Sequence, residues 1–354
     1  MSRYIVNQIS MVKENREWKS VTIIVLNYNG KEHLKECFES LEKLNYPKDK
    51  YEVIMPDNAS SDDSVSYIKE NFPQVRIIEF NENYGFAEGN NKGARMAKGE
   101  YIAFLNNDTR VDKNWLNELI KCVIKHPKMI CSSVMLYYDS EEKVAHNVGK
   151  RSMFGFTVPV DSGKKYSIQN LSQEYTFYPV GSGMLIKKDI FFSLGGFDSS
   201  YFMYSEDVSL GWKAWLFGYE VITVPSSIYW HKGRASSSNG GRSPMYIYLL
   251  WRNNMINMLK YPELQNVIKM LSLFFVISVA TSFLFLFKRQ FSLIYSIFKA
   301  YYAFSTLLPN ILKERKIIQS KRKISDKELY EKGIFMSIGE SIKETIKFAR
   351  KFKI

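Results

Sequence analysis

Residues 100–108, EYIAFLNND, decide the fold class of this chain. The run 101–105 is almost wholly apolar and follows a Lys-Gly pair, which is typical of a strand buried on both faces of a parallel sheet. The polarity then changes at once to Asn106, Asn107 and Asp108. Because open α/β sheets bind ligands at the carboxyl ends of their strands, these three side chains are candidate ligand-binding residues.

Two interpretations of this stretch are open. A carboxylate between amide neighbours on a rigid strand end suits Mg²⁺ or Mn²⁺, which would bridge to the phosphates of a substrate. Alternatively, Asn-Asn-Asp-Thr forms a turn in which Asp108 or Thr109 caps a helix that begins near Lys113. The stretch alone does not distinguish a metal site from a turn, so the rest of the chain has to decide between these interpretations.

The composition indicates one large globular domain with appendages, since 45% of the 354 residues are hydrophobic. The net charge of +13 is uneven, because residues 288–354 hold 16 Lys or Arg against 6 Asp or Glu. A nearly neutral body argues against nucleic-acid binding, and a basic tail suits anionic lipid head groups. The three cysteines form no Cys-x-x-Cys pair, which favours a reducing compartment over a zinc ribbon.

Strands and helices alternate along the first 110 residues. The expected strands are 21–26, 51–55, 75–80 and 101–105, and the expected helices are 31–44, a helix through residue 68 and a helix ending at 98. This alternation predicts a doubly wound parallel sheet whose Asn- and Asp-rich loops meet at one edge, as a nucleotide would require. Neither the dinucleotide-binding Gly-x-Gly-x-x-Gly motif nor the P-loop motif is present.

Five ordered segments resemble the family 2 glycosyltransferases of the GT-A fold, especially their rhamnosyltransferase-like branch. They are VTIIVLNYNG (21–30), PDNASSDDS (56–64), NENYGFAEGNNKG (81–93), YIAFLNNDT (101–109) and GSGMLIKKDIFFSLGGFDSSYFMYSEDVSLGWKAWLFGYEV (181–221). The similarity reaches beyond His231 and covers about residues 20–260. It implies a mixed, mainly parallel α/β sheet and a nucleotide-diphospho-sugar donor.

The resemblance implies donor-binding residues in the loops that follow the strands. They are Asn27, Tyr28, Asn29, Asp57, Asn58, Asn83, Gly85, Phe86, Asn90, Asn106 and Asn107. In this assignment Asn27 to Asn29 line the base and ribose, and Asp57 accepts a hydrogen bond from the base. Gly85 lies near the sugar and diphosphate, where we expect the phosphates to leave no room for a Cβ.

The resemblance also implies a metal site. Asp108 would be the carboxylate of the family's Asp-x-Asp motif, with Asn106 in place of the first Asp, so the motif keeps one acidic ligand. His231 ends a further expected strand and would also bind Mn²⁺ or Mg²⁺. A single His in a sequence is also commonly a polar residue with no ligand role.

Glu206 and Asp207 are the implied catalytic pair. Taken alone, two acids before a helix are expected to cap it and to compensate its dipole. The resemblance makes Asp207 the general base that deprotonates the acceptor hydroxyl during an inverting displacement, with Glu206 orienting the acceptor or the base. Ser209 stands where the family often has another acid, which leaves the acceptor contacts open.

We expect four regions in the chain. They are an N-terminal extension (1–19), a catalytic domain (20–242; donor half about 20–110, acceptor half about 111–242), membrane-associating helices (243–310) and a basic tail (311–354). Residues 138–178 are expected to form an acceptor-side insertion. The Ser/Gly-rich segment 234–242 either closes over the donor or is a flexible linker. The first 20 residues lack an apolar signal core, so we expect the catalytic domain in the cytoplasm.

Residues 270–287 form an uncharged stretch at the lower length limit for a membrane span. A single span would separate the basic tail from the catalytic domain, against the positive-inside rule. We therefore expect residues 265–323 to contact the membrane surface, either as interfacial helices or as one helical hairpin in which 291–308 returns. A buried pair of core helices is the third possibility.

The expected activity is inverting, metal-dependent, non-processive transfer of a sugar to a lipid-linked or glycan acceptor at the cytoplasmic face of the membrane. A processive polysaccharide synthase is the nearest alternative, but the chain lacks Gln/Arg-x-x-Arg-Trp. A sugar nucleotidyltransferase would carry a basic Gly-rich loop near the N-terminus, and a membrane scaffold would need no carboxylates at three strand ends. The sugar, the base, the acceptor and the oligomeric state are left open.

Overall fold

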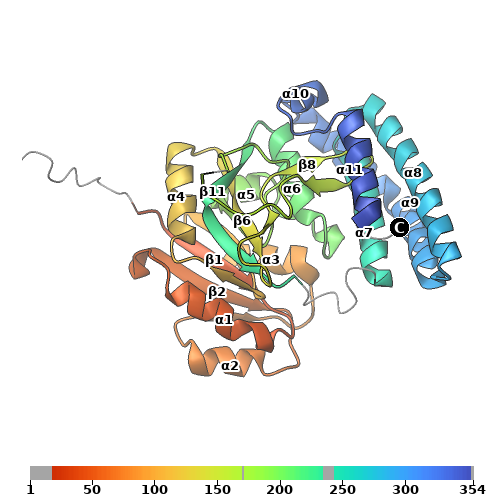
Figure 1. Ribbon diagram of the computed structural model, residues 1–354. Coiled ribbons are helices and arrows are strands. Elements are labelled where there is room, and N and C mark those ends of the chain that lie inside the picture. Colours follow the sequence, from red (N-terminus) through yellow and green to blue (C-terminus); the bar gives the residue numbers. More distant parts are fainter. Residues whose placement is uncertain (1–17, 170, 234–242, 352–354) are drawn as a thin grey trace, which may run out of the picture.

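The computed structural model describes residues 18–169, 171–233 and 243–351 (Figure 1). Most of the expected N-terminal extension and the segment 234–242 lie outside the described residues. The two interpretations of 234–242, a lid and a linker, therefore both stay open.

Within the described residues, nine strands form one mixed sheet at the centre of the α/β part of the chain. Its parallel half has the order β3-β2-β1-β4 and contains β1 (Val21–Leu26), β2 (Tyr51–Asp57), β3 (Arg76–Glu79) and β4 (Tyr101–Asn106). The sheet continues through β10 (Gly183–Lys187), β6 (Met129–Tyr137), β11 (Glu220–His231) and β5 (Thr109–Val111), with β7 (Val144–His146) beside β6. Strand β10 is antiparallel to both β4 and β6, so the sheet changes direction beside β4.

The central strands β1 and β4 are almost wholly apolar because both faces of the sheet are buried there. Successive residues alternate between the faces: Ile24 and Phe104 belong to one core cluster, whereas Val25 and Leu105 belong to the other. Helices cover the two faces, as Figure 1 shows. They are α1 (Lys31–Glu42), α2 (Ser64–Asn71), α3 (Gly85–Met96), α4 (Trp115–Lys125), α5 (Lys188–Ser193) and α6 (Glu206–Leu216). The expected α/β fold class is confirmed.

The helix-capping interpretation of Asp108 and Thr109 is wrong. Thr109 begins strand β5, and helix α4 starts only at Trp115, with Asn114 at the N-cap position. Strand β5 forms because its residues pair with the end of β11. Asp108 therefore lies between two strands of the same sheet.

The acceptor-side insertion contains β7 and a small hairpin of β8 (Gly149–Arg151) and β9 (Thr157–Pro159). Its turn packs against the C-terminal helices through Phe156, whose ring lies 5.9 Å from the Trp251 ring and 5.5 Å from the Phe274 ring. The insertion thus connects the sheet to the C-terminal helices.

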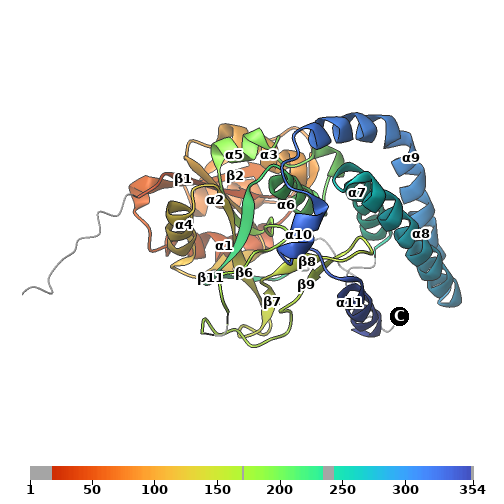
Figure 2. The same cartoon turned by 90° about the horizontal axis from the view of Figure 1, so that it is seen from above.

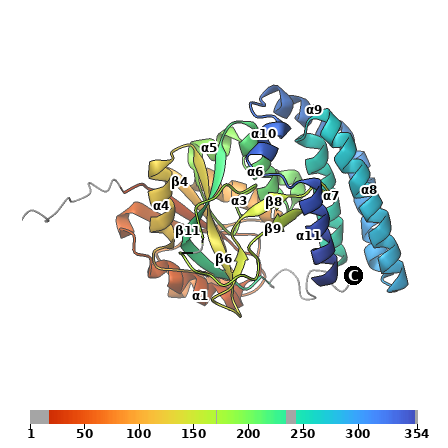
Figure 3. The same ribbon diagram turned by 45° about the horizontal axis from the view of Figure 1, so that its top comes forward.

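Three long helices lie together on one side of the sheet domain (Figures 1 and 3). They are α7 (Pro244–Lys260), α8 (Leu264–Phe287) and α9 (Phe291–Ser320). Helix α9 runs parallel to α7, since Lys299 Nζ lies 5.0 Å from the Tyr248 ring and Arg315 Nη1 donates to the Leu259 carbonyl at 2.7 Å. The predicted boundary between residues 310 and 311 falls inside α9, which curves over the top of α7 (Figure 2) and contains Pro309.

Helix α8 leaves much of its apolar surface uncovered. Among the described residues it is the one helix that is long and apolar enough to cross a membrane. Only 22% of its most apolar 18-residue stretch is buried inside the protein. The exposed fractions of Phe287 and Phe291, on either side of the α8–α9 turn, are 83% and 63%. The interpretation of α8 and α9 as a buried pair of core helices is therefore wrong.

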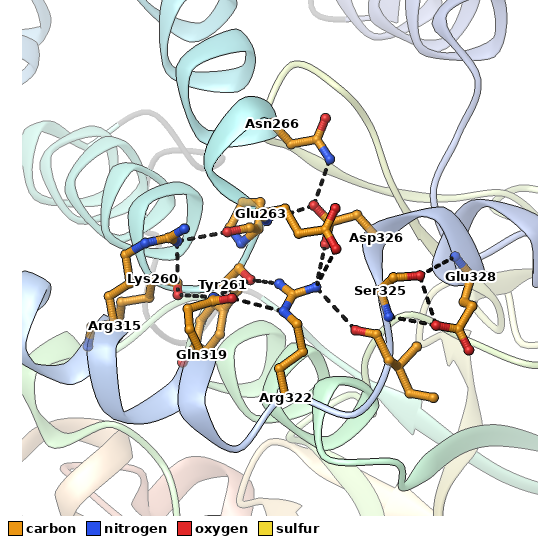
Figure 4. A network of polar contacts seen from close by, with 12 residues as sticks. Lys260, Tyr261, Glu263, Asn266, Arg315, Gln319, Arg322, Ser325, Asp326 and Glu328 are labelled. Carbon is orange, nitrogen blue, oxygen red and sulfur yellow. Dashed lines mark hydrogen bonds and ion pairs between the residues drawn. The ribbon is translucent and has the colours of Figure 1, made fainter.

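The residues after α9, within the expected basic tail, fold back onto the rest of the protein. Arg322 Nη1 donates to Asp326 Oδ1 at 3.0 Å, and Asp326 Oδ2 accepts from the Glu263 amide and from Asn266 Nδ2 (Figure 4). Arg315 is similarly engaged with carbonyls of the α7–α8 turn. Because these cations satisfy internal acceptors, they stabilise the helix packing as well as adding positive charge.

The last segments, α10 (Asp326–Glu331) and α11 (Ile338–Lys351), are joined by a stretch that pairs with the acceptor-side insertion. The Arg151 amide donates to the Ile334 carbonyl at 3.1 Å, and the Met336 amide donates to the Arg151 carbonyl at 2.8 Å. All three cysteines are free, with the Sγ atoms of Cys122 and Cys131 2.9 Å apart.

Candidate active site

The first loop of the site is built where β1 and β2 end side by side. Asn27 and Asp57 form a parallel bridge at this point, and both are buried. Asn27 Nδ2 donates to Asp57 Oδ1 at 2.9 Å, and Ser60 donates to the same carboxylate through Oγ (2.7 Å) and its amide (2.8 Å). The carboxylate is thereby fixed in one orientation at the carboxyl edge of the sheet.

Strand β4 contributes to the same network. Asn107 Nδ2 donates to Asn27 Oδ1 at 2.7 Å, so three neighbouring strands are connected by side chains at their ends. Asn29, with a positive φ of 49°, accepts from the Ser61 amide at 2.7 Å, whereas Tyr28 is half exposed. The structure therefore brings Asn27, Asn29, Asp57 and Asn107 together, with the Tyr28 ring open to solvent.

The loop before α3 forms a second group. Asn83 Oδ1 accepts from the Gly85 amide at 2.8 Å, and Asn58 Nδ2 donates to the Gly85 carbonyl at 3.0 Å. Asn90 is buried and donates to the carbonyl of Phe86, one turn earlier in the same helix. These side chains hold the start of α3 in place.

Gly85 has a reason to be glycine that the sequence did not reveal. Its φ is +72°, and a Cβ would lie 2.5 Å from both the ring and the carbonyl oxygen of Phe202. The contact is made by the acceptor half of the protein, so our expectation that phosphates exclude the Cβ is not needed to explain this residue. The Phe202 carbonyl instead accepts from the amides of Phe86 and Ala87 at the start of α3.

Asp108 and His231 meet at the end of the β5–β11 pair. His231 Nε2 lies 3.0 Å from Asp108 Oδ1, and His231 Nδ1 lies 3.2 Å from the Met135 sulfur. Burial raises the pKa of Asp108, but the hydrogen bond and charge of His231 outweigh it and the net pKa is lowered. The ionised carboxylate is therefore favoured even though its side chain is buried.

These residues fit a divalent cation. Asn106 lies beside the pair, with Nδ2 3.4 Å from His231 Nε2, and its buried Oδ1 has no hydrogen-bond partner among the described residues. A carboxylate, an imidazole and an unsatisfied amide oxygen are a mixed N/O donor set of the kind that Mn²⁺ and Mg²⁺ accept. Over the described residues no cluster of three His, Cys, Asp or Glu side chains is found, so a cation here would need further ligands from a substrate.

Glu206 and Asp207 open α6, as expected. Asp207 Oδ1 accepts from the Val208 amide at 2.7 Å, and Asp207 Oδ2 accepts from the Gly181 amide at 3.2 Å. Burial nonetheless raises the pKa of Asp207 to about 6. The pKa of Glu206 is raised well above its ordinary value by burial and by the charge of Asp207, and its Oε2 has no partner among the described residues. Asp207 is therefore the more readily ionised member of the pair, and its charge favours the neutral form of Glu206.

Asp207 and Asp108 both lie near the start of β10. Gly181, whose amide binds Asp207, precedes β10, and the ladder of β10 with β4 places Gly183 opposite Leu105, three residues before Asp108. The Tyr229 hydroxyl is hydrogen-bonded to Ser182, between these two glycines, at 2.8 Å. Burial raises the pKa of Tyr229, and the charges of Asp207 and Asp108 add smaller increases.

The loop that delivers Glu206 and Asp207 is strained. Phe202, Tyr204 and Ser205 have φ values of 62°, 67° and 67°, which are unfavourable for residues with side chains. Such strain persists only where the surroundings impose it. The α7 side chains described next supply that constraint.

Two residues of α7 hold this loop through its carbonyl groups. Asn253, which is fully buried, donates through Nδ2 to the carbonyls of Tyr204 (2.7 Å), Met203 (3.0 Å) and Tyr201 (3.3 Å). Arg252 donates to the carbonyls of Ser200 and Tyr201, both at 3.0 Å. We refer to Arg252 and Asn253 as the α7 clamp.

Sequence reasoning missed the α7 clamp and two other residues of the site. Ser60 orients Asp57, and Asn91 of α3 binds the main chain of Phe197 through both amide atoms (2.8 and 2.9 Å). A signal for the clamp was present, because Asn is unfavourable inside an apolar helix unless its side chain finds a specific partner.

The family model described as "Glycosyl transferase family 2" matches residues 22–194. Rhamnosyltransferase WbbL of Escherichia coli (strain K12) is 27% identical over 220 residues, which cover 58% of this chain and 81% of the relative. Poly-beta-1,6-N-acetyl-D-glucosamine synthase of Staphylococcus epidermidis is 24% identical over 233 residues, which cover 63% of this chain and 53% of the relative. The match therefore spans only about half the length of that synthase.

Solved structures show the same fold at low sequence identity. GalNAc-T7 with UDP, GalNAc and Mn²⁺ superposes with a TM-score of 0.58 at 17% identity, covering 71% of this chain and 49% of that one. Residues 1–349 of S. aureus TarS in complex with UDP-GlcNAc superpose with a TM-score of 0.55 at 19% identity, covering 90% and 93%. At these identities the likeness establishes the shared fold alone.

Proposed function

We propose that this chain, whose residues 22–194 match the glycosyl transferase family 2 model and whose fold is shared with the solved structure of GalNAc-T7, transfers a sugar from a nucleotide-diphospho-sugar to a lipid-linked or glycan acceptor. The proposed reaction inverts the anomeric centre, depends on a divalent cation and adds one sugar per encounter. The observation that carries the proposal is that Asp108 and His231 meet at the end of β4, while Asp207 is bound by the Gly181 amide just before the neighbouring strand β10.

In this proposal Asn27, Asn29, Asp57 and Asn107 form the nucleotide end of the crevice. Their mutual hydrogen bonds fix the orientation of the polar groups before a donor arrives, which lowers the entropy cost of binding. Tyr28 is exposed beside them and would pack against the base. Asn58, Asn83, Gly85, Phe86 and Asn90 act by shaping the start of α3 near the sugar and diphosphate.

Asp108, His231 and Asn106 would hold Mn²⁺ or Mg²⁺. A cation bound there would neutralise charge on the diphosphate leaving group. The solved structure of GalNAc-T7, which shares the fold, contains UDP, GalNAc and Mn²⁺, and this supports the assignment. The protein's own part is to keep Asp108 ionised through His231 and to present the amide of Asn106 beside it.

Asp207 is the proposed general base. Its carboxylate is oriented by two main-chain amides, and a pKa of about 6 keeps it ionised at neutral pH yet basic enough to accept a proton. The acceptor hydroxyl would lose its proton to Asp207 as its oxygen attacks the anomeric carbon. Protonated Glu206 would donate a hydrogen bond that orients the acceptor or the base.

A single transfer is favoured over processive synthesis. The similarity to WbbL covers 81% of that rhamnosyltransferase, whereas the similarity to the poly-N-acetylglucosamine synthase covers 53% of it. The chain also lacks the Gln/Arg-x-x-Arg-Trp segment expected of a processive enzyme. A sugar nucleotidyltransferase remains an outcome that the experiment below would reveal.

We place the enzyme at the cytoplasmic face of the membrane. The exposed apolar surface of α8 and α9 supports attachment to lipid, and three free cysteines are typical of a reducing compartment. Nucleotide sugars are available on that side, and an amphiphilic acceptor would present its hydroxyl there.

A screen of nucleotide sugars tests this function. Each is added to the full chain with Mn²⁺, with Mg²⁺ or with chelator, and the melting temperature is measured, because a ligand of the folded state raises it. We expect the nucleotide sugars that share one base to raise the melting temperature only when a cation is present. Without an acceptor, the protein should release the sugar of the bound donor slowly by hydrolysis. Release of pyrophosphate from a nucleoside triphosphate and a sugar phosphate would instead establish a nucleotidyltransferase.

A further inference from the structure

Arg151 of β8 is a buried cation that, among the described residues, is hydrogen-bonded to no carboxylate. The residue is 1% exposed, and its Cζ lies 4.9 Å from the centre of the Trp212 ring. Nη1 donates to Asn254 Oδ1 at 3.2 Å, whereas Nε and Nη2 have no partner in the described part of the chain. Burial lowers the pKa of Arg151 to about 9, so the guanidinium is still charged at neutral pH. A buried charge is costly unless an opposite charge accompanies it.

Two further buried nitrogen donors near Arg151 lack a partner within the residues that the structure describes. They are Trp212 Nε1 on α6 and Asn257 Nδ2 on α7, and both residues are fully buried. The Tyr201 hydroxyl donates to Asn257 Oδ1 at 2.9 Å, so the amide nitrogen is the atom of Asn257 that is left over. The unpartnered atoms of all three residues are therefore N–H donors.

The fold brings these donors to one place between β8, α6 and α7, which lie next to one another in Figures 1 and 3. Asn254, Asn257 and Tyr261 are spaced by three and four residues, so they share one face of α7. Asn254 binds Arg151, and the Tyr261 ring lies 5.3 Å from the Trp212 ring. Asn257 therefore lies between these two contacts, next to the adjacent Arg151 and Trp212 side chains.

An anion suits this set of donors better than a water molecule does. A water brings two hydrogens of its own, which none of the unpartnered atoms can accept. A halide brings no hydrogen, accepts from several donors at once and neutralises the guanidinium. Asp198 and Glu314 lie near Tyr201, but both are already paired with Lys260 Nζ at 2.5 Å.

We propose that Arg151, Trp212 and Asn257 bind one small monovalent anion, a halide such as chloride. The ion supplies the negative charge beside Arg151 and connects the acceptor-side insertion to α6 and α7. Its binding requires neither donor nor acceptor, so the site goes beyond the proposed function and stands independently of it.

Melting temperatures of the full chain in different salts of equal ionic strength test the site. Sodium chloride and sodium bromide should raise the melting temperature by about 3 °C or more over sodium gluconate, because an anion that binds the folded state stabilises it. Gluconate is too bulky for an enclosed site and serves as the reference. The rise should saturate with chloride concentration, which a general salt effect does not.

Two buried tryptophans of α6 give a matched pair of variants. Trp212→Phe keeps an aromatic ring beside Arg151 but removes the N–H, so the chloride concentration for half of the maximal rise should increase about fivefold or more. In the control Trp215→Phe, the lost Nε1 donor binds the Thr176 carbonyl at 3.1 Å. That control should lower the melting temperature equally in every salt. Arg151→Met, which removes the charge, should abolish the chloride dependence.

Crystals of the full chain grown with bromide locate the anion. We expect an anomalous-scattering peak within hydrogen-bond distance of the Arg151 guanidinium and Trp212 Nε1. Equal melting temperatures in chloride and gluconate would overturn the proposal, since water would then satisfy the donors. Equal chloride dependence of Trp212→Phe and Trp215→Phe would also overturn it, as would bromide peaks confined to exposed residues.

Discussion

His231 Nε2 lies 3.0 Å from Asp108 Oδ1, although 123 residues separate them in the sequence. The antiparallel ladder between β11 and β5 places His231 opposite Thr109, which is the neighbour of Asp108. Two candidate metal ligands are thus brought together by main-chain pairing, so their separation depends little on side-chain flexibility. The same pairing places them at the end of β4, beside the proposed diphosphate site.

The first prediction concerns the cation. Asp108→Ala and His231→Ala should each weaken Mn²⁺-dependent binding of the donor by about tenfold or more, because each removes a ligand from a small donor set. Donor affinity is measured by titration with and without chelator, and wild type in chelator is the reference. If chelator leaves wild-type affinity unchanged, the metal site has to be abandoned.

The second prediction concerns the proposed base. Asp207→Asn should lower kcat about 10²–10⁴-fold and leave donor affinity nearly intact. Asp189→Asn, an exposed acid on α5, serves as the control. A parallel loss of donor affinity in Asp207→Asn would move this residue from catalysis to donor binding.

The same Asp207→Asn variant should be more stable than wild type at pH 7.5. The folded-state pKa of Asp207 is raised to about 6, so the ionised carboxylate destabilises the folded state above that pH. Removing the charge should increase the free energy of unfolding by about 1 to 3 kcal/mol, and the gain should shrink as the pH falls below 6. Denaturant unfolding at pH 5 and pH 7.5 measures both values.

The third prediction is a pH dependence of the rate. Protonation of Asp207 removes the base, so kcat/KM should fall about tenfold for each pH unit below about 6. The groups that face this carboxylate are Glu206, Tyr178 and Tyr229, and we assign the acid limb to the coupled Glu206–Asp207 pair. Donor binding is followed over the same range. A flat profile between pH 5 and 8 argues against an Asp207 base.

The fourth prediction concerns Asn253 as a positioning residue. Asn253→Leu removes an Nδ2 group whose two N–H donors are shared among three carbonyls of the strained loop, so it should lower kcat about tenfold or more and shift the acid limb of the pH profile, with donor affinity within about twofold of wild type. The control Trp251→Phe loses one buried hydrogen bond from the same helix, to Ser278. If Asn253→Leu and Trp251→Phe show the same kcat and the same pH profile, the α7 clamp has a purely structural role.

The fifth prediction concerns membrane attachment. Replacing Phe287, Phe291 and Tyr295 by Ser should reduce binding to anionic vesicles at least about tenfold, because these exposed rings would enter the lipid interface. Vesicle sedimentation measures the bound fraction. The control replaces Met96, Ile124 and Ile168, which are exposed on the sheet domain. Equal vesicle binding by the two triple variants would contradict the proposed role of Phe287, Phe291 and Tyr295 in membrane attachment.

The arrangement of the expected donor half, residues 20–110, was predictable because it follows from patterns of neighbouring residues in the sequence. Strand β4 is apolar because it is buried on both faces, and its carboxyl end has to lie beside the ends of β1 and β2 in a parallel sheet. From that rule alone Asn27, Asp57 and Asn107 were expected to be neighbours, and the hydrogen bonds among them agree. The shorter β3 and the extended α9 differ from expectation at their ends, where sequence patterns are weakest.

Long-range contacts were not predictable in the same way. The reason for Gly85 is Phe202, and the reason that the loop before Glu206 stays strained is Asn253. The sequence around Gly85 does not indicate its contact with Phe202, and the sequence before Glu206 does not indicate its contact with Asn253. Likewise, Arg322 looks like part of a basic tail in sequence but binds Asp326 and the α7–α8 turn in the structure.

Local residue patterns predicted the α/β fold class, the polar edge of the sheet and the identities of the side chains that gather there. The contact of His231 with Asp108, the hydrogen bonds from α7 to the loop before Glu206 and the contact of Arg151 with Trp212 arise only when the whole chain has folded. Burial and strand ends can be predicted because they depend on residues that lie a few positions apart in the sequence. The approach of distant segments, by contrast, depends on how complete side chains pack once the whole chain has folded.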